Sequence, residues 1–293
     1  MIKSFSKSSI VSKHRFSSIQ KTVFDIEGYG MFEIMAVAAF IGTFVSGIWD
    51  LRTTEIPDGI PTLMAFFGVF GWLMYSANSL VPLIYSAVFG TALLIAGWLM
   101  YRLGQWGGGD AKLFAAVAYM LPIWQNRIFA IDFVANLFIV GAVYIMIYAL
   151  AAGIKNPNTF RLYKKDLAKN KKTVAAMLIV ALGLCFSMLY VSKRAGIELL
   201  LPAMLFGLVL FWRYGVVVEQ HVFRKRIASS ELRQGDVMLE SKKWDGIAES
   251  EISFIRREKK YVTIKDGVRF GPVFSIAFII TLFYGNLLFS AIL

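Results

Sequence analysis

Residues 81–113 read VPLIYSAVFGTALLIAGWLMYRLGQWGGGDAKL, an apolar run that ends in three glycines and an aspartate. A helix needs about 20 apolar residues to cross a bilayer, and the run over 81–102 is long enough. The whole chain of 293 residues is 57% hydrophobic, whereas soluble domains are about 45–50% apolar. The sequence therefore predicts a membrane protein with several spans.

Apolar runs of similar length recur along the chain. We predict an all-α fold, a polytopic integral membrane helical bundle of about eight spans with a small cytoplasmic segment. The fourth run is short, which indicates a helix that starts inside the membrane. The eight runs lie at residues 31–49, 59–77, 81–102, 110–122, 128–152, 173–191, 197–213 and 270–290.

Positive charge is concentrated in two of the connections. Residues 153–172 carry seven Lys or Arg and residues 213–269 carry thirteen. The turns at 78–81, 123–127 and 192–196 carry none, one and two. Because cytoplasmic loops collect Lys and Arg, we expect the two basic connections to face the cytoplasm and both termini to lie outside.

The first 30 residues disagree with this topology, because they place five Lys or Arg outside. Either downstream charge overrides the first span, or the natural chain starts at Met31, which opens that span. We favour the second explanation. The expected parts are then a basic segment 1–30 that is not native, a membrane domain 31–218, a cytoplasmic loop module 219–269 with a strand at YVTI, and a final transmembrane helix 270–293.

Composition argues against several other classes of protein. The net charge of +12 is explained by topology, so nucleic-acid binding is not expected. One cysteine, Cys185, excludes an internal disulfide and a cysteine-cluster zinc site. The two histidines, His14 and His221, are far apart in polar segments. We therefore predict no metal site and no cofactor.

Two aspartates stand out at one edge of the predicted membrane domain. Asp110 follows Gly107, Gly108 and Gly109 at the start of the fourth span, and Asp50 closes the first span. Backbone exposed by glycine at membrane depth must be satisfied by protein or water, which indicates a hydrated cavity. Two facing carboxylates that share a proton can activate a water and protonate a leaving amine. The pair therefore predicts aspartic-protease chemistry.

The motifs around these aspartates resemble those of a known family. IWDLRTTEIPD (48–58) and GGGDAK (107–112) are similar to the two catalytic boxes of the type IV prepilin peptidases, most closely the archaeal prearchaellin and prepilin signal peptidases. The resemblance covers the first four spans, and Gly271-Pro272 resembles the start of the family's last helix. The runs within 173–213 depart from the six-span archaeal enzymes.

The resemblance implies a membrane aspartyl endopeptidase in the cell membrane that acts at the cytoplasmic face. Its substrates would be prearchaellins and type IV prepilin-like proteins, from which it removes a short basic leader. Asp50 and Asp110 would be the catalytic pair, and Gly107, Gly108 and Gly109 would shape the site. Without the four cysteines of bacterial relatives, we expect cleavage without methylation.

Other polar residues have weaker predicted roles. Glu55 and Asp58 are candidates for attracting the basic leader, and Lys112 is expected to act on Asp110 or to pair with a lipid phosphate. Asp132 and Asn136 share a helix face, where a hydrogen bond between helices is the preferred interpretation.

Helix dipoles predict that Asp110 is the base and Asp50 the acid, provided that the first helix ends near Asp50. Three other functions remain open. A transporter or ion-conducting protein would use Asp50, Asp110 and Asp132 on an ion path, but neither paired repeats nor acids in mid-membrane are evident. A presenilin-like intramembrane protease would share the second box. An inactive scaffold is the third.

Overall fold

The computed structural model describes residues 29–192, 200–241, 244 and 246–292, so nearly all of the predicted segment 1–30 lies outside the described residues. The chain divides into two compact units. Unit 1 contains the chain up to Ala142, residues 241–245 and the chain from Arg269 onward. Unit 2 contains residues 143–240 and 246–268.

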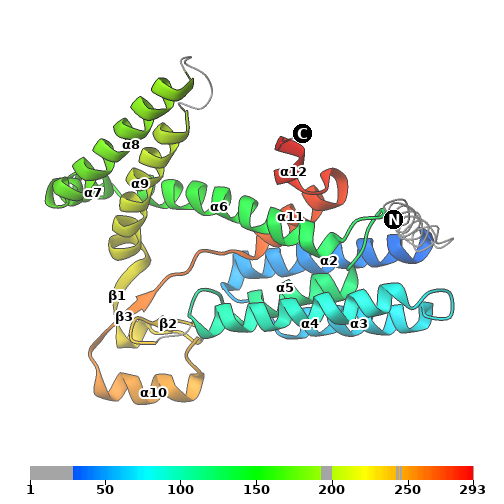
Figure 1. Cartoon of the computed structure of the whole chain (residues 1–293). Coiled ribbons are helices and arrows are strands. Elements are labelled where there is room, and N and C mark those ends of the chain that lie inside the picture. Colours follow the sequence, from blue (N-terminus) through cyan, green and yellow to red (C-terminus); the bar gives the residue numbers. More distant parts are fainter. Residues whose placement is uncertain (1–28, 193–199, 242–243, 245, 293) are drawn as a thin grey trace, which may run out of the picture. The chain divides into compact units, whose positions relative to one another are not determined.

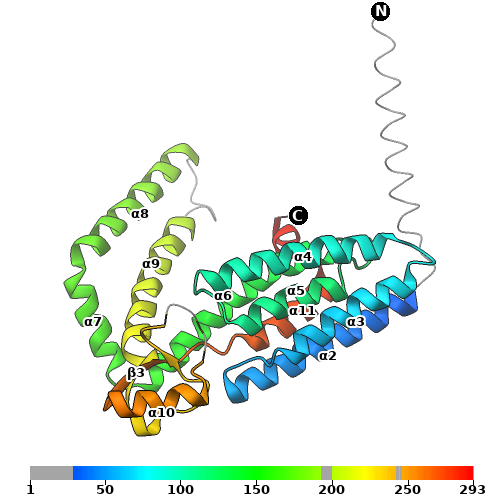
Figure 2. The same ribbon diagram turned by 90° about the horizontal axis from the view of Figure 1, so that it is seen from below.

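The longer helices of unit 1 run side by side (Figures 1 and 2). Helix α5 packs against α3 and α4, and α2 packs against α11. Helix α6 contributes only its first half to this unit. The helices are α2 (Tyr29–Thr53), α3 (Gly59–Tyr75), α4 (Val81–Arg102), α5 (Gly108–Met120), α6 (Phe129–Lys155), α11 (Gly271–Tyr284) and α12 (Leu287–Ile292).

Helix α5 is the centre of unit 1. Its residues from Leu113 to Ala118 are all buried. Four of these six residues are small: three alanines and one valine. Small side chains let neighbouring helices approach closely. The predicted fourth span is therefore a helix of 13 residues that is covered by protein.

The end of α5 is buried as well, and its last carbonyl groups have partners. The Trp72 indole N–H donates to the Met120 carbonyl at 3.0 Å, and the Ser86 hydroxyl donates to the Tyr119 carbonyl at 2.7 Å. The last carbonyls of a helix have no partner within the helix. These two side chains, from α3 and α4, therefore allow α5 to end inside the protein.

The structure supports fewer membrane spans by helix length than the eight predicted. Among the described residues, three helices are long and apolar enough to cross a membrane: 30–53, 81–102 and 129–155. A fourth is added if α7 and α8 form one bent span. Helices α3 and α11 are apolar but shorter, with 17 and 14 residues. Eight spans are thus not confirmed, because hydropathy does not distinguish a lipid-facing helix from one covered by protein.

The predicted last span is interrupted. Helix α11 ends at Tyr284, and Gly285 adopts a positive φ of 69° before α12 begins. The Asn136 amide donates to the Gly285 carbonyl at 2.6 Å and to the Thr281 hydroxyl at 2.9 Å. Its oxygen accepts the Leu287 N–H at 3.0 Å. One asparagine therefore satisfies backbone groups on both sides of the break.

Unit 2 combines helices with a small sheet. The helices are α7 (Thr159–Lys169), α8 (Lys171–Ser192), α9 (Leu200–Val218) and α10 (Glu249–Glu258), with short turns η2 (Glu219–Phe223) and η3 (Ser229–Glu231). The strands are β1 (Arg224–Ala228), β2 (Val237–Met238) and β3 (Tyr261–Lys265), in the antiparallel order β1-β3-β2.

The sheet belongs to the polar segment for which a mixed module was predicted. Strand β3 contains the predicted strand YVTI and pairs with β1 in a register that aligns Val262 with Ile227. A small core of Leu232, Ile247, Ile252 and Val262 joins the sheet to α10. The strands make the fold class mixed in this segment, although helices dominate the rest of the chain.

Candidate active site

The glycine run forms the N-terminus of α5. Gly107 is the N-cap residue in an extended conformation, and Asp110 lies in the first turn. The Asp110 carboxylate accepts a hydrogen bond from the Gly107 backbone N–H. The first N–H groups of a helix lack internal partners, and a carboxylate there is favoured by the helix dipole. The helix start thus orients Asp110.

Gly109 allows the first motif to touch the second. A Cβ on Gly109 would lie 2.7 Å from the Ile56 carbonyl oxygen and 2.7 Å from the Ile56 Cβ. Any larger residue would force these two segments apart. Ile56 belongs to the EIPD part of the first motif and is itself buried, so the two motifs that are separate in sequence form one structure.

Asp50 is buried in α2, with 6% of its surface exposed. Its Oδ2 accepts a hydrogen bond from the Gly271 backbone N–H at 2.7 Å. Gly271 is the first residue of α11. A Cβ on Gly271 would lie 2.7 Å from the Asp50 Cβ, so only glycine leaves room for this contact.

Helix α2 does not end at Asp50. It continues to Thr53, and the Asp50 carbonyl accepts the Thr54 N–H at 2.8 Å. Asp50 therefore lies in the last turn of α2, so the helix end that the sequence argument assumed is near this residue. The Asp50 carboxylate also faces the N-terminus of α11, where a helix dipole favours an anion, and the sequence argument did not include that second dipole.

The fold brings Asp50 and Asp110 together. The Asp50 charge lies close enough to act on the Asp110 carboxylate, and the Arg269 guanidinium acts electrostatically on Asp50. The pair therefore consists of two acids on different helices, each held by a backbone N–H of a helix start. The positive charge of Arg269 acts on Asp50, whereas the charge that acts on Asp110 is the negative one of Asp50.

Aromatic residues surround the segment before the glycines. The Trp106 ring is 5.1 Å from Phe114, 6.3 Å from Phe138 and Phe270, and 6.4 Å from Phe274, measured between centroids. Phe270 immediately precedes Gly271. The cluster therefore links the start of α5 to the start of α11, the two helix ends that hold the aspartates.

The remaining predicted residues lie nearer the surface. Lys112 pairs with Asp58 at 2.5 Å, and their side chains are 45% and 69% exposed. This partner is neither of the two that the sequence suggested for Lys112. Glu55 is exposed. Gly108 has room beside it, since the nearest side-chain atom to a Cβ there is a Tyr101 carbon at 3.8 Å.

Asp132 and Asn136 do not join the pair. Asp132 accepts a hydrogen bond from the Asn286 amide at 3.1 Å, and Asn136 bridges the break between α11 and α12. The interpretation of these residues as a hydrogen-bonded link between helices is confirmed. Within the described residues, no group of three or more His, Cys, Asp or Glu side chains is placed to hold a metal ion.

Sequence reasoning missed the roles of Arg269 and Gly271 in the site. Gly271-Pro272 was noted only as a resemblance. The sequence does contain a weak signal. A proline at the start of an apolar run indicates the first turn of a helix, and here an arginine stands just before it. Only the fold, however, places that start against Asp50.

Comparison with known proteins points to one family. Residues 37–152 match the type IV leader peptidase family. The chain is 29% identical over 118 residues to prepilin peptidase EppA of Methanothermobacter thermautotrophicus, which is 38% of this chain and 30% of that protein. It is 31% identical over 94 residues to the preflagellin peptidase of Methanocaldococcus jannaschii, 31% of this chain and 40% of that protein.

A preflagellin peptidase of Methanococcus maripaludis is 29% identical over 92 residues, 30% of this chain and 39% of that protein. The matched part therefore spans less than half the length of these relatives. No solved structure matches the chain. The matched region includes Asp50 and Asp110, and the resemblance found in the motifs is confirmed there: residues 37–152 are similar to the type IV leader peptidase family.

Proposed function

We propose that this protein is a membrane aspartyl endopeptidase that removes the short basic leader from prearchaellins and type IV prepilin-like proteins at the cytoplasmic face of the cell membrane. One observation carries the proposal. Two carboxylates from separate helices, Asp50 and Asp110, interact inside the part of the chain that is similar to leader peptidases. A single buried carboxylate would be a structural acid, whereas an interacting pair can share a proton.

The environments assign different roles to the two acids. Asp50 accepts the Gly271 N–H and adjoins Arg269, so its anion is the better stabilised. We therefore assign the general base to Asp50 and the acid to Asp110, the reverse of the assignment from sequence. Asp50 takes a proton from water while the water oxygen bonds to the scissile carbonyl carbon. Asp110 donates a hydrogen bond to the carbonyl oxygen. Asp50 then gives the proton that it took from water to the leaving amine as the C–N bond breaks.

The basic leader requires acidic groups near this pair. Asp58 is already engaged by Lys112, whereas Glu55 is exposed on the same loop. We assign Glu55 the main attraction for the leader and Asp58 a smaller one. Gly107, Gly108 and Gly109 shape the site, because without side chains they let the substrate backbone approach closely. The chemistry needs no metal or cofactor, because the carboxylates move the protons themselves.

The topology and the organisation of the chain complete this proposal. We retain the placement of the basic connections in the cytoplasm, the eight crossings, a membrane domain over 31–218, a loop module over 219–269 and a final membrane segment over 270–293, which contains α11 and α12. Membrane lipids are the expected surroundings, and nucleic acid is not an expected partner. An ion path through Asp132 is disfavoured, since that carboxylate is hydrogen-bonded to Asn286.

The test uses the purified full-length chain with candidate prearchaellins and prepilins, and mass spectrometry of the products. We expect a mass loss at the leader junction for the native sequence. Asp50→Asn and Asp110→Asn should each abolish cleavage while the protein still folds, because a shared proton requires both acids. Asp132→Asn is the matched control and should cleave normally. Near-normal processing by either active-site variant would refute the proposal.

A further inference from the structure

Helix α7 has two faces of different character. With 3.6 residues per turn, its partly buried residues fall on one side of the helix: Leu162, Tyr163, Asp166 and Leu167. Its exposed residues fall on the other side: Phe160, Arg161, Lys164, Lys165, Ala168 and Lys169. We call this second set the basic face.

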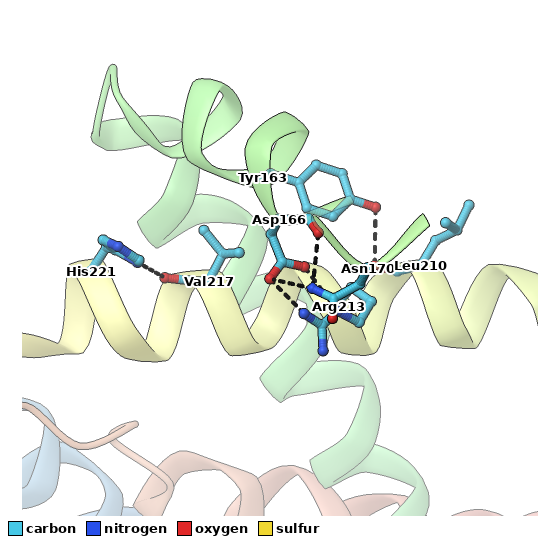
Figure 3. A network of polar contacts seen from close by, with 7 residues as sticks. All are labelled: Tyr163, Asp166, Asn170, Leu210, Arg213, Val217 and His221. Atoms are coloured by element: carbon cyan, nitrogen blue, oxygen red, sulfur yellow. Dashed lines mark hydrogen bonds and ion pairs between the residues drawn. The ribbon is translucent and has the colours of Figure 1, made fainter. Parts of the chain in front are cut away.

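Contacts with α9 fix which face of α7 is covered (Figure 3). The Arg213 guanidinium donates two hydrogen bonds to the Asp166 carboxylate, at 2.8 Å and 2.5 Å. The Tyr163 hydroxyl donates to the Leu210 carbonyl at 3.1 Å, and its ring meets that of Tyr214 edge-on at 5.5 Å. A bidentate pair has a defined geometry, so α7 cannot rotate without breaking it.

This arrangement leaves the basic face with uncompensated charge. Asp166 is the one acid in residues 153–172, and it is engaged by Arg213 on the covered side. The outward side carries four cations, with Lys155, Lys171 and Lys172 exposed on its flanks. Phe160 is 64% exposed among them, with the Lys164 ammonium 4.7 Å from its ring centroid. A surface of this kind is complementary to an anionic partner with an apolar boundary.

The neighbouring helix indicates what that partner is. Helix α7 meets α8 at a bend of 77°. Helix α8 is apolar and exposes large side chains, including Ile179, Val180 and Phe186. When α8 enters the bilayer, a helix nearly perpendicular to it lies along the membrane surface. At the membrane surface the groups nearest to α7 are lipid headgroups, which favours lipid over nucleic acid as the anionic partner.

We propose that α7 lies along the membrane surface and that its basic face binds the phosphodiester headgroups of anionic lipids. Each Lys or Arg near an anionic bilayer contributes its own share to the free energy of membrane binding. The proposal does not rest on the peptidase activity, because none of its residues belongs to the aspartate site. Helix α7 lies just before the runs within 173–213, which depart from the six-span enzymes.

The first test measures lipid binding to the full-length protein in uncharged detergent. Native mass spectrometry would follow titration with phosphatidylglycerol or phosphatidylcholine. The variant R161Q/K164Q/K165Q/K169Q should bind phosphatidylglycerol at least about tenfold more weakly, with phosphatidylcholine unchanged. The control R226Q/R233Q/R257Q/K260Q removes the same charge from other exposed positions and should bind phosphatidylglycerol like the native protein.

Several outcomes would overturn the proposal. Equal losses in the two variants would indicate a general effect of net charge. Displacement of the lipid by millimolar inorganic phosphate would indicate a site for free anions. Tighter binding of a short RNA than of phosphatidylglycerol at 0.15 M salt would assign the surface to nucleic acid.

A second test measures the depth of α7 directly in bilayers containing phosphatidylglycerol. In a Cys185→Ser background, a spin label at Ala168→Cys would report on the basic face. We expect the label at headgroup depth from its accessibility to oxygen and to a water-soluble nickel relaxant. A label that is fully water-exposed, or one in the hydrocarbon core, would refute the proposal even if the charge variant failed to fold.

Discussion

The Gly271 backbone N–H donates a hydrogen bond of 2.7 Å to Oδ2 of Asp50 across 221 positions of sequence. It joins the first helix of the described chain to the start of α11. Pro272, the next residue, packs against α2, since a Cβ on Gly47 would lie 3.0 Å from the Pro272 Cα. The start of α11 therefore sets the position of one acid of the candidate pair.

Gly271→Ala should reduce kcat by about a hundredfold and change KM little. The new Cβ would lie 2.7 Å from the Asp50 Cβ, and a shift of about 1 Å in a catalytic group costs roughly that factor. Gly59→Ala is the control, because no atom lies within 4 Å of a Cβ there. Steady-state cleavage of a leader peptide would measure both constants, and an unchanged kcat would contradict this role of Gly271.

Arg269→Gln should lower kcat about tenfold, while Arg269→Lys should keep most of the rate. The positive charge of Arg269 acts on Asp50. A tenfold change in rate corresponds to about 1.4 kcal/mol, which is within the range of about 1–4 kcal/mol for two charges near a protein surface. Arg269→Met keeps the length of the side chain without its charge. If Met restores the rate as well as Lys does, the contribution is packing and not charge.

The neighbouring glycines of the second motif should respond differently to alanine. Gly109→Ala would place a Cβ 2.7 Å from the Ile56 carbonyl oxygen, whereas the nearest atom at Gly108 is 3.8 Å away. We expect Gly109→Ala to lose most activity and about 1–3 kcal/mol of stability, and Gly108→Ala to lose much less of both. Cleavage rates and thermal unfolding in detergent would show the order, and the reverse order would contradict the geometry.

Asn136→Ala should lower the free energy of unfolding by about 1–3 kcal/mol. The side chain is fully buried and makes three hydrogen bonds around the break at Gly285. Asn78→Ala, in an exposed turn, is the matched control. Thermal unfolding in detergent gives the difference, and equal effects of the two changes would indicate that the break is supported by other contacts.

The ion pair between Lys112 and Asp58 should contribute less than about 1 kcal/mol. Both side chains are largely exposed, so water and salt screen the attraction. A double-mutant cycle with Lys112→Met and Asp58→Asn would measure their coupling by thermal unfolding, at low salt and at 0.5 M salt. A coupling well above this bound that persists at high salt would show that the pair is buried in the bilayer-embedded protein.

The sequence by itself located the helices and the two motifs. The length of an apolar run depends on local sequence alone, so α2, α4 and α6 lie close to the predicted runs 31–49, 81–102 and 128–152. The same holds for the strand YVTI. The acids of the two motifs could be named because ionisable residues at the edges of membrane spans are candidates for function.

Only the tertiary structure decided what surrounds each element. Hydropathy could not show that α5 is covered by α3 and α4, because a buried helix and a lipid-facing helix are equally apolar. Nor could it place Gly271 and Arg269 beside Asp50, since that contact depends on how distant helices pack. The helix-dipole argument for the two acids was incomplete for this reason: it considered the helix that carries Asp50, and not the dipole of α11, whose first N–H group bonds to the Asp50 carboxylate.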